Sequence, residues 1–468
     1  MSETVSGRKS AALILAVVAF VTLMDGLDGS IVNVALPEMA RSFGTDTGTI
    51  SWVTITYFVM LAGLLLTFAR VSKNGLIKKV LLMGLVLFTA SSLFCGISVN
   101  FQMLLAFRIL QGAGAAMMGA AAPMVCVKYL PASSLGLGMG VLTLGCSIGF
   151  AMGPVIGGIL TDLLSWHWIF LINIPVGLAA TPLLIKAIPK DEGYNGKSLD
   201  AIGAALLFSA IMCGVLAIER APHLESAVPV ILAALGCAAF LAAFIAVEQR
   251  KDDPLLDLRI FKHWKFNSVL VSYMLANLVY MGLFYLLPFY MSVCLGFSPL
   301  TTGMFILISP LLTLVLCVPI SKWSDRTERR AFAVASCFVM MVGCIIMVLF
   351  APGSGILPLV ATLVSMGLMW ALCGGPMASR VIENTEDESK EIGSSVMTQF
   401  IYLGGTLGAA LFAMFFTFGS GAGNISLSEL PPDIFLDGFV FASIAGTAIA
   451  AVSIIFSFIV KEPRKVRQ

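Results

Sequence analysis

Fourteen long apolar segments dominate this sequence and limit the folds that are open to it. Each is about 20 residues long or longer, which is the length that an α-helix needs to cross the hydrocarbon core of a bilayer. Only 12% of the 468 residues are charged, whereas soluble domains carry about 25%. The sequence therefore predicts an all-α membrane protein with 14 transmembrane helices, which lie within residues 11–36, 50–70, 79–98, 101–128, 136–161, 166–186, 199–219, 227–247, 267–294, 300–321, 331–350, 356–380, 392–418 and 436–460.

The basic residues predict how these helices are oriented. An even number of crossings places both termini on one side of the membrane. When that side is the inside, 25 of the 28 Lys and Arg residues fall in inside loops or tails. Arg41 and Arg220 fall outside, and Arg108 lies within a helix. By the positive-inside rule, we expect a multi-pass protein of the cell membrane with both termini in the cytoplasm.

The loop lengths divide the predicted helices into three groups. The two longest inside loops, 187–198 and 248–266, flank the seventh and eighth helices. We therefore expect two six-helix bundles, residues 1–190 and 266–468, with a two-helix insert at 191–265 between them.

Two weak repeats support this division. A basic loop follows the second helix of each bundle, "ARVSKNGLIKKV" (69–80) and "SKWSDRTERR" (321–330). The fifth helix of each bundle carries glycines four residues apart, which are Gly145, Gly149, Gly153 and Gly157 in the first and Gly404 and Gly408 in the second. Internal repeats are common in secondary transporters.

The glycines of the fifth helix predict a close helix contact. Small residues at this spacing let two helices approach each other. Pro154 permits a bend because it removes a backbone hydrogen bond, and Gly158 adds a further small residue. We expect a pivot between the two bundles at this point, with ordinary close packing as the alternative.

Asp25 and Asp28 are the most unusual residues of the first apolar segment. An ionised aspartate near a helix centre costs about 2.5–3.5 kcal/mol, and each Leu, Ile, Val or Phe returns about 0.3–0.6 kcal/mol. The 13 such apolar residues of this segment return about 6 kcal/mol, which only balances two aspartates. The carboxyls must therefore face a wet cavity, find a partner or carry protons. A spacing of three residues places both on one helix face, so they are candidates for a proton or cation site.

A structural role remains open as an alternative for each of these carboxyls. Each could be a structural group that is bonded to local polar residues such as Ser30 or Asn33. Arg108 is the natural partner of Asp28, because it stays protonated within a predicted helix. If the distance between the two changes during transport, the proton affinity of Asp28 changes with it. A static salt bridge between the first and fourth helices is the alternative.

Other polar and aromatic residues within the predicted helices could line a substrate cavity. An aromatic face can hold a cation at about 0.5–2 kcal/mol. Packing in the core or toward lipid is the alternative for each of them. The candidates are Gln111, Trp52, Tyr57, Asn277, Tyr280, Tyr285, Gln399 and Tyr402.

Several classes of function are disfavoured by what the sequence lacks. The ten cysteines lie in apolar runs without a C-x-x-C pair, so we expect neither disulfides nor a metal site. No phosphate-binding G-x-x-x-x-G-K-[ST] loop occurs, so transport would be driven by an ion gradient rather than by ATP. We expect no catalytic residues, no cofactor and no nucleic-acid partner. The expected partners are a small-molecule substrate, protons and the lipid bilayer, and we expect a monomer.

Four motifs resemble those of the major facilitator superfamily, and more narrowly of its fourteen-helix drug:proton antiporters. They are "LDGSIVNVALP" (27–37), "RILQGAGAAMM" (108–118), "GFAMGPVIGGIL" (149–160) and "WHWIFLINIPVG" (166–177). The resemblance implies two six-helix bundles that work by alternating access. It also favours Asp28 as the signature acid of the first helix.

The loop between the second and third helices departs from the family pattern. Where the family has an acid, this sequence has Ser72 or Lys73, depending on register. The corresponding loop of the second half keeps Asp325. The resemblance implies a cytoplasmic gate built from Lys73, Lys78, Lys79, Asp325, Arg326 and Arg329, with a weaker first half.

These observations predict a proton-coupled exporter of apolar or cationic small molecules, of the multidrug-efflux type. One alternative is a dedicated exporter of a single metabolite, antibiotic or lipid on the same scaffold. An alternative of another class is a proton-independent facilitator or a membrane receptor, in which the aspartates are structural.

Overall fold

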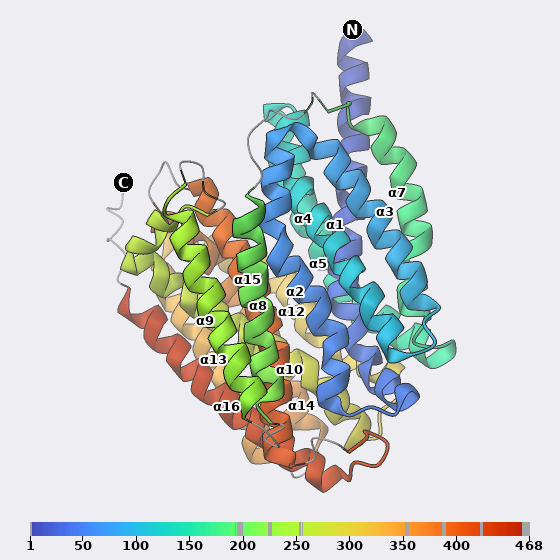
Figure 1. Ribbon diagram of the computed structural model, residues 1–468, viewed down its shortest axis with the longest axis vertical. Helices are drawn as coiled ribbons and strands as arrows, with labels where there is room; N and C mark the ends of the chain where they lie inside the picture. The colour runs from blue at the N-terminus through green and yellow to red at the C-terminus, as the bar shows by residue number, and fades with distance from the viewer. Residues whose placement is uncertain are drawn as a thin grey trace.

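The computed structural model describes residues 2–191, 193, 200–222, 227–251, 254, 256–351, 355–385, 390–421 and 425–460, and every regular element in this part of the chain is a helix (Figure 1). The long elements of the first half are α1 (Ser2–Phe43), α2 (Thr47–Val71), α3 (Ile77–Gly96), α4 (Phe101–Tyr129), α5 (Ala132–Leu163), α7 (Asn173–Ala187), α8 (Ala201–Arg220) and α9 (Val228–Glu248). Those of the second half are α10 (Trp264–Val293), α12 (Ile308–Arg326), α13 (Arg329–Phe350), α14 (Ile356–Glu383), α15 (Lys390–Ser420) and α16 (Pro432–Ile459). Shorter elements are η1 (Ser72–Leu76), α6 (Trp168–Leu171), η2 (Leu258–Lys262) and α11 (Pro299–Ile306).

Thirteen helical segments of the described chain are long and apolar enough to cross a membrane. One of them, Thr47–Gly96, has 50 residues and would extend for about 75 Å if straight, more than twice the hydrocarbon thickness. It bends at Asn74 and Gly75, where Gly75 has a φ of +103°, and α2 and α3 on either side both pack against α4. The segment count therefore differs from the 14 predicted helices at this bend, where two predicted helices fall within one segment.

The fifth helix of each predicted bundle packs against the first helix of the same bundle. In the first half α5 lies along α1, and in the second half α15 lies along α10. A Cβ on Gly149 would lie 2.4 Å from the Leu23 carbonyl oxygen, and one on Gly408 would lie 2.4 Å from the Leu278 carbonyl oxygen. Both positions therefore need glycine, because the opposing atom belongs to a backbone that cannot yield.

The contact made by the α5 glycines differs from the one expected. Gly145, Gly149, Gly153 and Gly157 all face α1 of their own half rather than the second bundle. Gly158 does approach the second half, since its Cβ would lie 2.5 Å from the Pro299 carbonyl oxygen at the start of α11. The Pro154 carbonyl approaches Gly303 in the same way. The four-residue spacing of these glycines predicts which face of α5 makes a close contact. It does not predict which helix lies opposite that face.

The insert joins the two halves on the side away from α5 and α11. α8 packs against α2 of the first half and α15 of the second, while α9 packs against α8 (Figure 1). In α9 only Phe244 and Glu248 are buried. Most of α9 therefore presents apolar surface to its surroundings, as a lipid-facing helix does.

Two faces of the molecule are used below as reference points. The terminal face is the one at which α1 begins and α16 ends (Figure 1). α2 and α9 also end at this face, with Arg70 and Glu248 in their last turns. At the opposite face α2 begins with Thr47 and α8 ends, with Glu219 in its last turn. The halves touch there, because Arg41 Nη2 donates to Ser292 Oγ at 2.6 Å and Leu427 N donates to the Thr45 carbonyl at 3.2 Å.

Candidate functional site

Asp28 and Arg108 form a buried ion pair between α1 and α4. Arg108 Nη1 lies 2.7 Å from Asp28 Oδ2. The side chain of Arg108 is 1% exposed and that of Asp28 is 0% exposed. Arg108 Nε also donates to the Val53 carbonyl on α2 at 2.9 Å. The guanidinium carbon lies 4.4 Å from the centroid of the Tyr57 ring, which is a cation–π distance. Arg108, which belongs to α4, is thus held by partners on α1 and α2.

Two amide side chains complete the surroundings of Asp28. Gln111 Nε2 donates to Asp28 Oδ1 at 2.9 Å and to Ser92 Oγ at 2.8 Å. Asn173 Nδ2 on α7 donates to the same carboxyl oxygen at 3.4 Å. A buried charge is tolerated when it is paired and hydrogen-bonded, and Asp28 has both an ion-pair partner and amide donors.

Asp25 has a different environment, although it lies only one turn away on α1. It is partly exposed, whereas Asp28 is 1% exposed. Its hydrogen-bond donor is the Tyr57 hydroxyl, at 3.2 Å. A Cβ on Gly29, one turn further along α1, would meet no atom within 4 Å, so open space lies beside this face. Asp25 is therefore the less buried residue of the two.

The local partners considered for these carboxyls bond elsewhere. Ser30 Oγ donates to the carbonyls of Gly26 and Leu27, and Asn33 Oδ1 accepts from Thr54 Oγ1. The two aspartates are instead served by side chains from α2, α4 and α7.

The second half reaches toward this site through α15. Tyr402 packs against the apolar core of the first half and lies near Asp25. Gln399, one turn before it, donates from Nε2 to the Ala62 carbonyl of α2. Asp25 therefore lies where the two halves meet, while Asp28 lies inside the first half.

The remaining cavity candidates make helix–helix contacts in this conformation. Asn277 Nδ2 donates to the Ile401 carbonyl at 2.6 Å, and the Tyr280 hydroxyl lies 3.3 Å from Ser309 Oγ. The Tyr285 hydroxyl donates to the Thr47 carbonyl across the halves. Trp52 is partly buried against an apolar core that is built from residues of both halves.

The predicted gate residues fall into several groups. Lys78 Nζ donates to the carbonyls of Ile185 and Ile188 at the end of α7. Arg329 forms an ion pair with Glu383. The side chains of Lys73, Lys79 and Arg326 are exposed, and that of Asp325 lies outside the described part.

Sequence reasoning missed Asp191 at this place. Its two carboxyl oxygens accept the backbone N–H groups of Lys78 and Lys79, each at 2.9 Å. These donors belong to the first turn of α3, where a carboxylate satisfies unpaired amides and the helix dipole. An acid from the loop after α7 thus lies beside the loop that lacks the family's acid. Its position directly after the sixth predicted helix was the only sequence signal.

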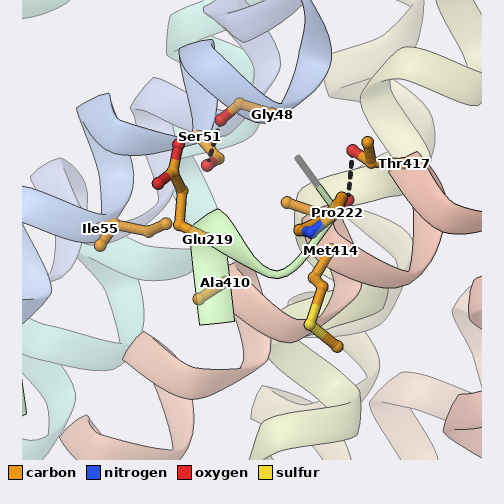
Figure 2. Close-up of a pocket in the computed structure, with 9 residues that line it drawn as sticks. Gly48, Ser51, Ile55, Glu219, Pro222, Ala410, Met414 and Thr417 are labelled. Carbon is orange, nitrogen blue, oxygen red and sulfur yellow. Dashed lines mark hydrogen bonds between the residues drawn. The ribbon is translucent and has the colours of Figure 1, made fainter. Parts of the chain in front are cut away.

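A small pocket lies between the halves near the opposite face (Figure 2). Its lining comes from α2, α15 and the end of α8. The Glu219 carboxyl lies beside Ser51 of α2, and Met414 and Thr417 line the α15 side. The insert therefore contributes an acidic side chain to the junction of the two halves. No group of three or more residues suited to a metal ion occurs in the described chain.

The fold and these motifs can be compared with known proteins. The family model described as Major Facilitator Superfamily matches residues 18–409. The chain belongs to the Major Facilitator Superfamily. It is a multi-pass membrane transporter and not an enzyme.

Relatives in this superfamily carry two kinds of name. The chain is 28% identical over 414 residues to the riboflavin transporter RibZ of Clostridioides difficile, covering 87% of this chain and 89% of that one. It is 28% identical over 402 residues to the putative multidrug resistance protein MdtD of Salmonella typhimurium, covering 85% of each.

Solved structures of the superfamily share the fold. A bacterial homologue of the human lysosomal transporter Spinster, in an inward-facing and unoccupied conformation, gives a TM-score of 0.69 at 13% identity, over 96% of both chains. A POT family transporter in complex with a thioalcohol-conjugated peptide gives 0.69 at 15% identity, over 95% of this chain and 96% of that one.

Proposed function

We propose that this transporter is a proton-coupled exporter of small apolar or cationic molecules, with 14 transmembrane helices in two six-helix bundles and a two-helix insert. The observation that carries the proposal is the contrast between the two aspartates of α1. Asp28 is neutralised by Arg108 and amide donors, whereas Asp25 is partly exposed at the meeting of the halves.

In this proposal the two carboxyls have different roles, a fixed ion pair at Asp28 and proton binding at Asp25. The ion pair with Arg108 occupies the Asp28 carboxyl and fixes α1 against α4. Asp25, with a single tyrosine hydroxyl as donor, can accept a proton without breaking an ion pair. A movement of α15 relative to α1 changes the electrostatic surroundings of Asp25, since Tyr402 is carried by α15. Proton binding at Asp25 is thereby coupled to the arrangement of the two halves.

The proposed orientation follows from the basic loops. The terminal face would lie in the cytoplasm and the opposite face outside, in agreement with the Lys and Arg distribution. The contacts of Arg41 with Ser292 and of Leu427 with Thr45 then close the outer side. In the proposed cycle these contacts break when the outer side opens, a proton enters Asp25 from outside, and it leaves inside as substrate binds.

The breadth of substrates has two candidate answers. The MdtD name supports multidrug efflux, and the RibZ name supports a dedicated substrate. Multidrug efflux agrees better with the apolar and aromatic residues near the meeting of the halves, which offer a cation–π surface without a fixed set of polar donors. Competition between chemically unrelated substrates distinguishes the two answers.

Transport by purified protein in proteoliposomes under an imposed pH gradient tests the proposal. The gradient should drive efflux by the wild type, and Asp25→Asn should bind substrate yet lose the response to the gradient. Asp162→Asn is the matched control, because Asp162 is an exposed residue of α5. Transport by the wild type that ignores the gradient would favour a facilitator instead. If efflux by the Asp25→Asn variant still responds to the gradient, the proton-coupling role would belong to Asp28 instead.

A further inference from the structure

Two carboxyls are buried at the end of the insert that lies on the terminal face, far from the aspartates of α1. Asp200 is the residue before α8, and Glu248 is the last residue of α9. They are 7% and 3% exposed. Acidic residues are almost never this buried unless they are paired, so their surroundings need an explanation.

One oxygen of each carboxyl is well satisfied. Asp200 Oδ1 accepts from the Gly203 N–H at 2.7 Å, which caps the start of α8, and it forms an ion pair with Lys251. Glu248 Oε2 accepts from the Leu256 N–H at 3.0 Å. These bonds join the ends of α8 and α9 to the loop that follows α9.

The other two oxygens point at each other. A Cβ on Gly203 would lie 2.4 Å from Glu248 Oε1 and 2.5 Å from Asp200 Oδ2, so both oxygens converge on one point beside α8. Both are buried, and neither has a hydrogen-bond partner if both groups are ionised. One proton between them satisfies both at once, because one oxygen then donates and the other accepts.

The charges around the pair also favour a single proton. Among the described residues, Lys251 is the cation that interacts with both carboxyls, so two ionised carboxylates would exceed the positive charge beside them. Burial favours the neutral form of Asp200, but hydrogen bonds from Glu248, Lys251 and the Gly203 backbone outweigh it and hold the pKa of Asp200 below its usual value. Glu248 is accordingly the group that carries the proton.

We propose that Asp200 and Glu248 bind one proton between them and that this proton holds the end of the insert against α2. The link to α2 runs through the loop after α9. Arg70, in the last turn of α2, donates from Nη1 to the Pro254 carbonyl at 2.6 Å, two residues before the Leu256 N–H that Glu248 accepts. α15 also packs against α8, but its charged residues Lys390 and Glu391 have side chains outside the described part.

Loss of the proton would release this link. The pair then carries two negative charges against one lysine, and repulsion separates the ends of α8 and α9. The loop is freed from Glu248, and its hold on Arg70 weakens just before the η1 bend between α2 and α3. On the face that we propose is cytoplasmic, the insert would thus report internal pH to the loop between the second and third helices.

Hydrogen–deuterium exchange of the full-length protein in lipid nanodiscs tests this inference. For the wild type, exchange of the Leu256 amide, corrected for its intrinsic pH dependence, should rise roughly tenfold per pH unit once the proton leaves. Glu248→Gln should keep this amide protected at every pH, because a neutral amide can donate to Asp200 without being titrated. Asp200→Asn retains a capping side chain and removes the repulsion. Exchange of the Leu256 amide in this variant should therefore also be independent of pH.

The controls separate a sensor from a merely structural pair. Glu328→Gln, at an exposed position on the same face, should keep the wild-type profile. The inference is overturned if Glu248→Gln follows the wild-type pH dependence, or if both variants expose Leu256 at all pH values. Asp200→Asn keeps the test decisive should Glu248→Gln fail to fold. The readout needs neither substrate nor gradient, so failure of proton coupling at Asp25 would leave it unaffected.

Discussion

Arg108 Nη1 and Asp28 Oδ2 lie 2.7 Å apart in the interior of the first half, with almost no exposed surface on either side chain. The pair joins α1 to α4, and the Val53 carbonyl and Gln111 extend it to α2 and α3. Asp28 is therefore a fixed point of the bundle. Among the described residues, Asp25 has a tyrosine hydroxyl as its donor and neither a cation nor an amide, which is why our proposal places the exchangeable proton on Asp25.

Removal of one partner of this pair should be strongly destabilising. Asp28→Asn leaves the Arg108 guanidinium buried without its counter-ion, and breaking a buried pair in this way costs about 3–5 kcal/mol. Thermal denaturation in detergent should show a lower midpoint than for Asp25→Asn, which removes no ion pair. The double variant Asp28→Asn with Arg108→Gln should recover part of the loss. Equal midpoints for the two single variants would contradict the assignment.

The contact between α5 and α1 should tolerate no side chain at its centre. Gly149→Ala would place a methyl group 2.4 Å from the Leu23 carbonyl oxygen, and overpacking of this kind costs about 1–3 kcal/mol. Gly140→Ala is the matched control on the same helix, because its Cβ would meet no atom within 4 Å.

The two alanine variants should therefore move in opposite directions. Replacement of glycine by alanine in an open helical position stabilises by about 0.5–1 kcal/mol. Thermal midpoints in detergent measure both, and a neutral Gly149→Ala would show that α1 and α5 are less tightly packed than described here.

Asp191 should stabilise the start of α3. Asp191→Ala removes the acceptor of the Lys78 and Lys79 amides, and loss of a helix cap costs about 0.5–2 kcal/mol. Exchange of these two amides should increase, while Asp162→Ala, at an exposed position of α5, should leave them unchanged. Asp191→Asn should be milder, because an amide oxygen can still accept one of the two bonds.

The sequence was informative wherever a residue is out of place in an apolar helix. Asp28 and Arg108 could be paired in advance, because each is too costly to leave alone among lipid-compatible residues. The glycine spacing likewise indicated a close helix contact on one face of α5. The helix opposite could not be read from that spacing, since every neighbouring helix offers a backbone to a glycine.

Contacts that depend on the path of the loops were not predictable. Asp191 reaches α3 from a loop more than a hundred residues further along the chain. Asp200 and Glu248 stand at the edges of apolar segments, where acidic residues ordinarily mark the membrane boundary. Their meeting depends on how the α8–α9 pair closes at the terminal face, which no local pattern encodes.

The charge of Asp200 should give the protein a specific acid dependence. Its pKa is lower in the folded protein than in an unfolded chain, because hydrogen bonds from Glu248, Lys251 and Gly203 outweigh the opposing effect of burial. The stabilisation is therefore complete above about pH 4 and is lost as the pH falls through the folded pKa.

Comparison with Asp200→Asn isolates this contribution. Asparagine still caps α8 but carries no charge, so the wild type should be more stable by about 1 kcal/mol at mildly acidic pH, where Glu248 keeps its proton, and the difference should close below about pH 4. Thermal midpoints in detergent across this range measure the difference. Glu328→Gln should show a constant offset from the wild type, because Glu328 is exposed. A pH-independent gap for Asp200→Asn would mean that Asp200 contributes through its hydrogen bonds and not through its charge.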